Sequence, residues 1–495
     1  MRASYLKEID MKLDRIGTIA TFNLLILAAV LPACRADGFE HPCSWDAFNP
    51  GLHGIGDHPK GMIGGAFDGR YIYFAPYGQP DYTGDVLRLD TLGDFTDVAA
   101  WSSFNPDLNG VGVHPVGYWS AVFDGRYVIF IPMQNDTGHH GEVLRYDTTG
   151  EFENVASWEA FDPGANGVGV DPDGFINGVF DGRYVYFCPY NNGTRKHGEV
   201  MRYDTTGAFS DVASWITFDC YEYGVGVQYG YAGATFDGRY VYFAPYGINN
   251  LSNHGEVRRY DTHGEFTDAS SWEAYNAAEH GLGVDPEGYV GAVFDGHYVY
   301  FVPYLNYPYY HGEVLRYDPT GNFDELSSWA VYDPGAAGLG NYLDGFIGGI
   351  FDGHYIYFIP AANNTEGIHS HFLCYDTTAP FDELTSWRTF DPRDFGISNQ
   401  LGGYMEAVFD GRHIYFTPNR WLASTYGQIL RYDTHTCPGD VNHDSVVDLS
   451  DLATLLGNYG LTADATCEDG DIDCDWDIDL DDLAALLGAY GDLCN

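Results

Sequence analysis

The stretch YWSAVFDGRYVIFIPMQNDTGHHGEVLRYD, residues 118–147, decides the fold of this chain. An alternating segment meets the turn Asp124-Gly125, and a second segment rich in β-branched and aromatic residues follows, which predicts a β-hairpin. A variable loop leads to a third segment, and a fourth opens with Trp158. The four segments span residues 118–123, 127–132, 141–147 and 158–161. The stretch and the segment that follows it therefore predict four short antiparallel strands.

This unit is repeated along the chain. The tripeptide Phe-Asp-Gly occurs seven times, and the six intervals between its copies cover 342 residues, a mean of 57. A repeat of this length indicates an array of equal supersecondary units. No unit carries an apolar stripe of helical period, which excludes a helical solenoid. Four antiparallel strands per unit are typical of one blade of a β-propeller. The repeated aspartates are Asp68, Asp124, Asp181, Asp237, Asp295, Asp352 and Asp410.

The tryptophan of the fourth strand shows how the array closes. Its first copy, Trp45, precedes any complete unit, and no tryptophan strand follows the last third strand, 427–433. Residues 44–48 are therefore expected to supply the outer strand of the last blade, which removes exposed sheet edges. We predict an all-β seven-bladed propeller over residues 38–436. The tryptophans are Trp45, Trp101, Trp158, Trp215, Trp272, Trp329 and Trp387.

The hairpin around Phe-Asp-Gly, the Tyr-Asp strand and the tryptophan resemble kelch-type propellers over all seven units. The paired glycines that end the second kelch strand are replaced here by Pro-Tyr, so the resemblance implies the fold and no binding residues. Kelch-like propellers serve as binding scaffolds and, in some cases, as enzymes. The replacements are Pro76-Tyr77, Pro189-Tyr190, Pro245-Tyr246 and Pro303-Tyr304.

The charge and the N-terminus limit where the protein works. With 71 acidic against 23 basic residues, the net charge of −48 excludes nucleic acid and anionic lipid surfaces as partners. Basic residues precede an apolar run at 16–31, so residues 1–36 are predicted to be a signal peptide of a secreted protein without a membrane span. The alternative is a cell-surface lipoprotein that carries its lipid on Cys34 of the sequence Leu-Pro-Ala-Cys.

The strongest chemical signal is a duplicated acidic unit near the C-terminus. Residues 439–460 and 470–491 repeat one pattern at an offset of 31, and the 59 residues from Cys437 onward hold 15 acids without a Lys or Arg. Oxygen donors at loop positions 1, 3, 5, 9 and 12, with a backbone carbonyl at 7, suit a calcium ion. Two calcium ions are therefore expected in residues 437–495. The predicted ligands are Asp440, Asn442, Asp444, Val446, Asp448 and Asp451 in the first loop, and Asp471, Asp473, Asp475, Asp477, Asp479 and Asp482 in the second.

With Asp at position 12, the two loop–helix units resemble a type I dockerin over residues 439–491. The resemblance implies a small all-α domain, residues 437–495, that binds two calcium ions and docks into a cohesin-like partner. Position 6, usually Gly, is Ser445 in one loop and Trp476 in the other, which is expected to weaken the loops. Leu449-Ser450 and Leu480-Asp481 stand where a Ser-Thr pair reads the cohesin, so the partner's identity is not implied.

The cysteines allow several frameworks. Four cysteines in the last 59 residues admit three pairings, of which Cys437 with Cys494 would clasp the ends of the small domain. Cys43 could instead bond Cys437. Cys188 and Cys374 lie in predicted strands and are expected to be buried free thiols.

The loops between second and third strands and the loops between blades are expected to lie on one face, the mouth. The first set is variable, as a recognition surface requires. Tyrosines and histidines repeat at its edges, and aromatic stacking on sugar rings predicts a carbohydrate or polysaccharide ligand. The alternative is that residues repeated in register do the same packing task in every blade. The candidate ligand-binding residues are Tyr77, Tyr190, Tyr246, Tyr304, His140, His197, His254 and His311. The glutamates expected to face an arginine across the strands are Glu142, Glu199, Glu256 and Glu313.

Catalytic residues are not identified by the sequence. A glycosidase needs two facing carboxylates, which the loop acids could supply, and three or more unrepeated polar residues on the axial channel would favour catalysis. The leading hypothesis is a secreted binding protein for a carbohydrate or other extracellular polymer. The alternatives are a glycoside hydrolase or polysaccharide lyase with its site at the mouth, and a protein-interaction scaffold. The loop acids are Asp171, Asp173, Asp285, Glu287 and Asp344.

Overall fold

The computed structural model describes residues 38–56, 61–78, 82–226, 230–249, 252–284, 286–398, 402–418, 427–435, 439–442, 444, 446–463, 465–473 and 476–491. Several sequence predictions lie outside these residues. They concern the signal peptide 1–36 with Cys34, the loop acid Asp285, the loop residues Ser445 and Asp475, and Cys437, Cys474 and Cys494. Among the described residues, no helix has the length and apolarity needed to span a membrane.

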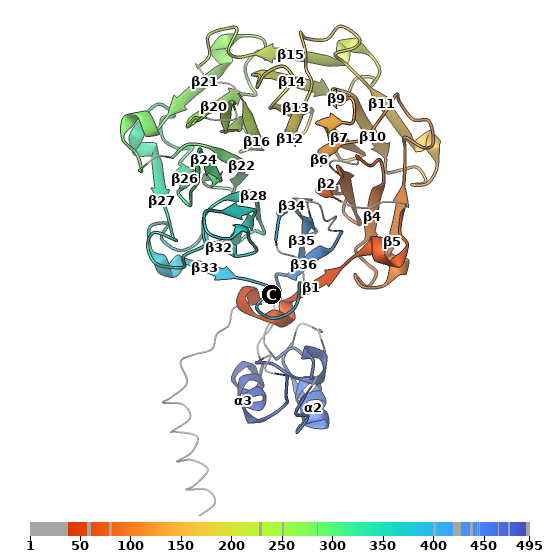
Figure 1. The fold of residues 1–495 in the computed structure, drawn as a ribbon, viewed down its shortest axis with the longest axis vertical. Helices are drawn as coiled ribbons and strands as arrows, with labels where there is room; N and C mark the ends of the chain where they lie inside the picture. Colours follow the sequence, from red (N-terminus) through yellow and green to blue (C-terminus); the bar gives the residue numbers. More distant parts are fainter. Residues whose placement is uncertain are drawn as a thin grey trace, which may run out of the picture. The chain divides into compact units, whose positions relative to one another are not determined.

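Residues 42–435 form one compact unit, a seven-bladed propeller (Figure 1). Each blade is a four-stranded antiparallel sheet whose first strand lies nearest the axis. Blades one to three are β2 (Met62–Phe67), β3 (Tyr71–Pro76), β4 (Val86–Asp90), β5 (Trp101–Phe104); β6 (Tyr118–Phe123), β7 (Tyr127–Pro132), β10 (Val143–Asp147), β11 (Trp158–Phe161); and β12 (Phe175–Phe180), β13 (Tyr184–Pro189), β14 (Glu199–Asp204), β15 (Trp215–Asp219).

The remaining blades follow the same order. Blades four to six are β16 (Tyr231–Phe236), β17 (Tyr240–Pro245), β20 (Glu256–Asp261), β21 (Trp272–Asn276); β22 (Tyr289–Phe294), β23 (Val299–Pro303), β26 (Val314–Tyr317), β27 (Trp329–Tyr332); and β28 (Phe346–Phe351), β29 (Tyr355–Pro360), β32 (Phe372–Asp376), β33 (Trp387–Phe390). Blade seven is β34 (Tyr404–Phe409), β35 (His413–Pro418), β36 (Ile429–Asp433) and β1 (Trp45–Phe48).

The N-terminal strand closes the ring, as predicted. β1 pairs antiparallel with β36, with Trp45 opposite Tyr432 and Phe48 opposite Ile429. The indole of Trp45 stacks on Phe390 at a centroid distance of 5.1 Å and on Phe416 at 5.6 Å. Because β36 is paired on both sides, the last blade has no free third strand. The seven-bladed fold class and its closure are therefore confirmed.

The repeated motifs have structural tasks. In the first copy, Asp68 accepts hydrogen bonds from the backbone N–H groups of Arg70 at 2.8 Å and Tyr71 at 2.7 Å, and from the Tyr73 hydroxyl at 2.8 Å. Gly69 takes the left-handed conformation that the turn requires, with φ 102°. The aspartate thus holds the hairpin turn on the face opposite the mouth.

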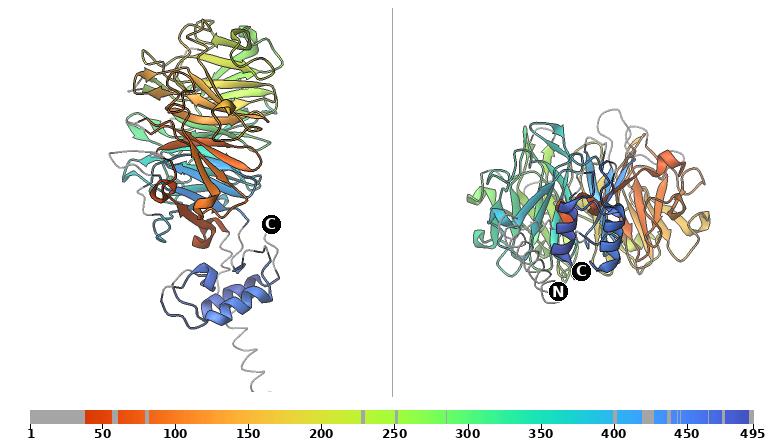
Figure 2. Two further views of the ribbon diagram at one scale, coloured as in Figure 1. Left: turned by 90° about the vertical axis from the view of Figure 1, so that its right-hand side faces the viewer. Right: turned by 90° about the horizontal axis from the view of Figure 1, so that it is seen from below.

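The second unit comprises the described residues of 439–491 together with residues 38–41. Its two helices are α2 (Leu449–Asn458) and α3 (Leu480–Ala489), which pack side by side (Figures 1 and 2). A small apolar core holds them together. Its buried members are Val441, Val447, Leu455, Ala465, Ile472, Ile478 and Leu486. His41 joins this unit, because its imidazole Nε2 lies 2.5 Å from the carbonyl oxygen of Ile472.

Short elements complete the fold. Hairpins between second and third strands are β8 (Gln134–Asn135) with β9 (Gly138–His139), β18 (Gly247–Asn249) with β19 (Ser252–Asn253), β24 (Leu305–Asn306) with β25 (Tyr309–Tyr310), and β30 (Ala362–Asn363) with β31 (Gly367–Ile368). The 3₁₀ turns are η1 (Gly38–Glu40), η2 (Pro42–Ser44), η3 (Pro50–His53), η4 (Val98–Ala100), η5 (Val155–Ser157), η6 (Val212–Ser214), η7 (Ala269–Ser271), η8 (Ala278–His280), η9 (Leu326–Ser328), η10 (Leu384–Ser386) and η11 (Cys467–Asp469).

Candidate metal site and propeller mouth

The start of each C-terminal helix positions two of the predicted metal ligands. Asp448 caps α2 by accepting a hydrogen bond from the Ser450 N–H at 2.6 Å, and Asp451 accepts one from the Asp448 N–H at 2.8 Å. Asp479 and Asp482 form the same reciprocal capping box on α3. Each helix therefore fixes loop positions 9 and 12 through its first turn.

The carboxylates at position 12 are fully buried. Asp451 accepts a further hydrogen bond from the Asn442 N–H at 3.0 Å, and Asp482 accepts bonds from Ile472 N–H at 2.6 Å and Asp473 N–H at 3.1 Å. The sequence provides no Lys or Arg from Cys437 onward to neutralise them. Because a buried charge is costly without a counter-charge, these carboxylates fit a bound cation.

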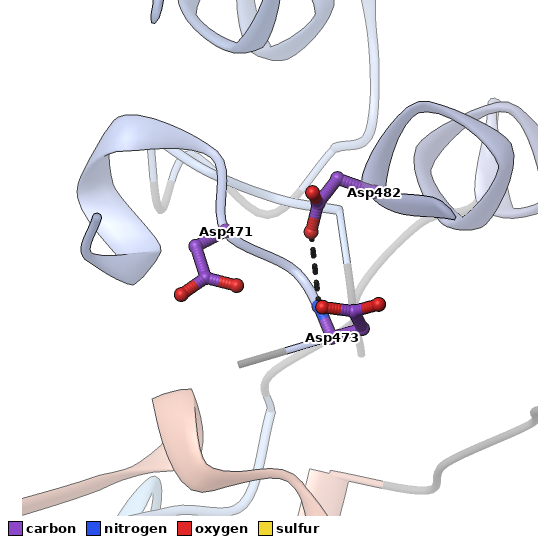
Figure 3. A group of neighbouring side chains, drawn as sticks. All are labelled: Asp471, Asp473 and Asp482. Atoms are coloured by element: carbon purple, nitrogen blue, oxygen red, sulfur yellow. Dashed lines mark hydrogen bonds between the residues drawn. The ribbon is translucent and has the colours of Figure 1, made fainter. Parts of the chain in front are cut away.

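The second loop gathers its oxygens at one point. Figure 3 shows Asp471, Asp473 and Asp482 around a common centre, and ligand oxygens of these three side chains lie within 4.8 Å of one another. Asp477, Asp479 and Asp482 form a second group by the same measure. This donor set of carboxylate oxygens matches the preference of a hard cation. The C-terminal aspartate cluster can therefore bind a metal ion, while its assignment to calcium stays a prediction.

The first loop is held by hydrogen bonds among its own residues. The Asp444 N–H donates to Asp440 Oδ1 at 3.1 Å and to Asn442 Oδ1 at 2.9 Å, so positions 1 and 3 turn toward position 5. Val446 N–H donates to Asp444 Oδ1 at 3.1 Å, which tightens the turn before position 7.

Trp476, at position 6 of the second loop, has the left-handed conformation with φ 75°. A side chain with a Cβ costs about 1 kcal/mol or more there, so Trp476→Gly is expected to raise the metal affinity of this loop about fivefold. Calorimetric titration with calcium measures the change. Trp476→Ala is the control, because it removes the indole and keeps the strain. A gain of the same size in the alanine variant would contradict the explanation by backbone strain.

The structure gives the bonding state of five cysteines. Cys43 and Cys467 are both disulfide-bonded. Cys188 and Cys374 are buried free thiols, as expected, and Cys220 is a third.

The predicted tyrosines lie at the mouth. Tyr77 and Tyr304 are buried, and Tyr190 and Tyr246 are half-buried. All four pack against the apolar residues at the second position of the innermost strands, such as Ile176 on β12. The structure therefore brings the tyrosines together around the axis.

The predicted histidines lie beneath the mouth. Each imidazole packs edge-on against the first aromatic residue of the innermost strand. The pairs are His140 with Tyr118 at 5.7 Å, His197 with Phe175 at 5.8 Å, His254 with Tyr231 at 5.4 Å, and His311 with Tyr289 at 5.3 Å. Burial lowers the pKa of His140, His197 and His311 to about 4, so these rings are neutral near pH 7. This geometry gives the histidines a packing task, and ligand binding by them stays a prediction.

The expectation that the repeated glutamates face an arginine across the strands is wrong. Glu142 accepts hydrogen bonds from the backbone N–H groups of Val113 at 2.7 Å and His114 at 3.0 Å. Glu199 and Glu313 hold the equivalent loops. Glu256 pairs with Arg258, at 3.3 Å, but on its own strand. A carboxylate accepting loop amides fixes the connection between blades, which the spacing of residues within one strand does not reveal.

A ring of residues that the sequence analysis missed lines the mouth. Each member directly precedes the third-strand histidine or its counterpart and lies close to a glycine at the start of the next blade. A Cβ atom on Gly230, for example, would lie 3.1 Å from Cβ of Lys196. The members differ in chemistry, and all but Lys196 are half-buried. This mouth ring consists of Tyr82, His139, Lys196, Asn253, Tyr310 and Ile368, above Gly117, Gly174, Gly230, Gly288, Gly345 and Gly403. A comparison of the seven repeats for their most variable position could have found it.

Three unrepeated polar residues meet on the propeller axis. Ser120, Asn177 and Glu406 occupy the third position of their innermost strands, where four other blades have glycine. The Ser120 hydroxyl donates to Glu406 Oε2 at 2.8 Å, and Asn177 Nδ2 donates to Oε1 at 3.4 Å. Trp119 adds a further side-chain hydrogen bond. Asn177 and Glu406 line a cavity of about 70 Å³.

Glu406→Gln is expected to flatten the pH dependence of stability between about pH 4.5 and about pH 7. Burial raises the pKa of Glu406 from 4.5 to about 7, so between these values the folded protein binds a proton that the unfolded chain releases. The contribution of Glu406 to stability is therefore greatest below pH 4.5 and falls by about 3 kcal/mol as the pH rises through 7.

Thermal unfolding of wild type and variant across this range measures the effect. Glu153→Gln, which neutralises an exposed carboxyl, is the control for the change in charge. Parallel profiles for wild type and Glu406→Gln would contradict the expected role of the axial carboxyl.

The predicted loop acids are distributed over several blades. Asp173 lies near Asp162, Asp171 and Glu199, and burial together with these charges raises the pKa of Asp173 to about 7. Asp344 accepts hydrogen bonds from Asn364, and burial raises its pKa above the usual range. Asp171 and Asp173 therefore lie together beside blade three, and Asp344 lies apart from them with Asn364.

Comparisons with known proteins show no family for this chain. No family model matches the chain, and no curated protein matches it. Among solved structures, the chain is similar to the structure of YjhT, at 10% identity and a TM-score of 0.43 over 68% of this chain and 99% of that chain. It is also similar to the computationally designed Ika8 protein, at 10% identity and a TM-score of 0.42 over 78% of this chain and 99% of that chain. The assignment as a seven-bladed propeller rests on the strand pairing of this chain itself.

Proposed function

We propose that this protein is a secreted binding protein whose propeller recognises a polysaccharide at its mouth and whose C-terminal unit binds two calcium ions and docks into a cohesin-like partner. The mouth ring carries the proposal for the propeller. Five kinds of side chain occupy the six equivalent positions above a repeated glycine. Variation at the rim of a rigid scaffold is the arrangement expected of a recognition surface.

The helices of the C-terminal unit support the proposed docking. Leu449 and Leu480, the first residues of α2 and α3, are 68% and 57% exposed, and Leu456 and Leu487 are 52% and 54% exposed. Two equivalent pairs of exposed leucines form an apolar surface for a protein partner. The signal peptide predicted from the sequence and the disulfide bonds of Cys43 and Cys467 support an extracellular location.

A second candidate is an enzyme, since three unrepeated polar residues converge on the axis. Two observations make it the weaker one. The axial cavity of about 70 Å³ holds a few water molecules and is several-fold smaller than a typical ligand pocket of roughly 300 Å³ or more. Among the described residues that line this cavity, Glu406 is also the only carboxylate, whereas glycoside hydrolysis needs two.

The experiment that separates the two functions uses the calcium-loaded full chain on a panel of polysaccharides. Binding is measured by affinity electrophoresis and calorimetry, and product formation by reducing-end release and absorbance of unsaturated products. Binding without turnover supports the proposed function. Product formation that Glu406→Gln abolishes would establish the enzyme instead, and failure to bind any polymer would overturn the polysaccharide proposal.

A further inference from the structure

One basic side chain at the mouth is unlike the others. Only two lysines, Lys60 and Lys196, follow the first 37 residues of this chain, and Lys196 is the one that the structure describes. It belongs to the mouth ring and lies on the hairpin of blade three, where it pairs with Asn191 in an isolated β-bridge. The hairpin therefore holds its backbone in place.

The ammonium group of Lys196 lies on tyrosine rings. Its Nζ is 3.1 Å from the centroid of Tyr190 and 5.6 Å from that of Tyr246, and the side chain is 7% exposed. Such cation–π contacts favour the protonated amine. The tyrosines continue as a row across blades four and five, because the Tyr190–Tyr246 and Tyr246–Tyr304 centroids are each 6.1 Å apart and Tyr304 lies 5.4 Å from Tyr310.

Lys196 has no carboxylate partner among the described residues. The arginines of the hairpin turns, in contrast, bind aspartates at 2.6 to 2.7 Å, as Arg126 does with Asp147 and Arg183 with Asp204. Even Arg195, the neighbour of Lys196, has Asp219 at 3.8 Å. In a chain with 71 acidic residues, a nearly buried lysine without a counter-ion indicates a position reserved for an external anion.

We infer that Lys196 binds the carboxylate of a sugar acid, and that the ligand is a neutral polysaccharide carrying isolated uronic acid residues. The inference rests on the proposed function and names its ligand class. Tyr246 and Tyr310, the half-buried members of the row beyond the Tyr190 ring under the amine, supply apolar surface for neutral sugars, while the single amine accepts one carboxylate. A densely charged polyanion is excluded as the ligand, because the net charge of −48 repels it.

The protonation of Lys196 supports this assignment. Burial lowers the pKa of Lys196 to about 7, and a bound carboxylate favours the charged amine and raises that pKa again. The titratable groups that face Lys196 are His139, Tyr190 and Tyr246, and none of them carries a negative charge near pH 7. Affinity for the acidic sugar is therefore expected to fall as the pH rises above about 7.

The test compares glucuronoxylan, a neutral chain with isolated glucuronic acid branches, with the same polymer after reduction of its carboxyl groups. Wild-type, calcium-loaded full-length protein is expected to bind the acidic form about tenfold more tightly, the value of one charge-assisted hydrogen-bonded contact. Lys196→Met is expected to bind both forms with the lower affinity, and Lys196→Arg to keep the preference. Arg195→Met removes one positive charge from the same hairpin and is expected to leave the preference unchanged.

The outcomes separate the two proposals. Equal binding of both polymers by wild type and Lys196→Met overturns the role of Lys196 and leaves polysaccharide binding standing. An Arg195→Met effect as large as that of Lys196→Met overturns the specific contact in favour of general electrostatics. Failure to bind either form of this polymer overturns the inference on Lys196 and leaves the polysaccharide proposal to the wider panel.

A measurement on the wild-type sequence keeps the inference testable even if Lys196→Met fails to fold. Reductive methylation with ¹³C labels the few lysine amines, and their methyl resonances report the pKa of Lys196 directly. Glucuronoxylan is expected to raise this pKa by about one unit or more, as the tenfold preference requires. An unchanged titration in the presence of saturating glucuronoxylan would overturn the inference.

Discussion

Asp482→Asn is expected to reduce the calcium stoichiometry of the protein from about two ions to about one. The Asp482 carboxylate is fully buried, belongs to both oxygen groups of the second loop, and caps the loop onto α3. An amide at this position removes one negative charge and turns an N–H₂ group toward backbone donors. Loss of a ligand that is also part of the helix cap is expected to weaken this site by roughly 100-fold or more.

Asp481→Asn is the matched control. Asp481 is the adjacent residue, carries the same charge and is exposed. It is expected to leave both the stoichiometry and the affinities unchanged. Calorimetric titration of the calcium-free full chain measures all three proteins. Equal losses in the two variants would mean that the acidic unit attracts calcium only through its total charge, and would contradict the assignment of two ordered sites.

Trp45→Ala is expected to destabilise the propeller by about 3–5 kcal/mol, the range for truncating a large buried aromatic side chain. Trp45 is 4% exposed and packs between residues of blades six and seven, with ring centroids of Phe372 at 5.3 Å and Tyr432 at 4.8 Å. Its loss weakens the only strand that joins the beginning of the chain to the last blade. A propeller opened at this seam exposes the edge of β36 to other molecules.

Two measurements check this expectation. Chemical denaturation gives the loss of stability, and light scattering reports self-association of the opened ring. Val113→Ala, at a side chain that is 93% exposed, is the control and is expected to change stability by less than about 0.5 kcal/mol. A variant Trp45→Ala as stable as the control would contradict the view that this strand holds the ring together.

The features predicted correctly are those whose partners lie within one repeat or at a constant spacing. The Phe-Asp-Gly turns, the strand order in each blade and the pairing of Trp45 with the last blade all follow from residues that recur in register. The acids of the C-terminal loops belong to the same class, because a tight loop followed by a helix brings neighbours such as Asp479 and Asp482 together locally. Because these contacts are short-range, both the fold and the candidate metal site can be predicted from the sequence.

The repeats also led to a wrong prediction for the repeated glutamates. Two of the recurrent histidines, His197 and His254, are buried under the mouth, and ligand binding by the histidines stays a prediction. Glu142 was expected to pair with an arginine. Instead, its carboxylate accepts hydrogen bonds from two backbone amides of the loop that connects the first and second blades. Residues that repeat in every blade serve the framework, because every blade needs the same contacts.

The amino-acid sequence by itself determined the number of blades, their closure by the N-terminal strand and the duplicated acidic loops, since each of these depends on local patterns and their period. Only the tertiary structure decided which unrepeated residues meet. Ser120 and Glu406 are 286 positions apart and touch because two innermost strands converge on one axis. Lys196 is placed on the rings of Tyr190 and Tyr246 because neighbouring blades pack side by side. The chemistry of the mouth and of the axis is set by the closed ring, which no single repeat contains.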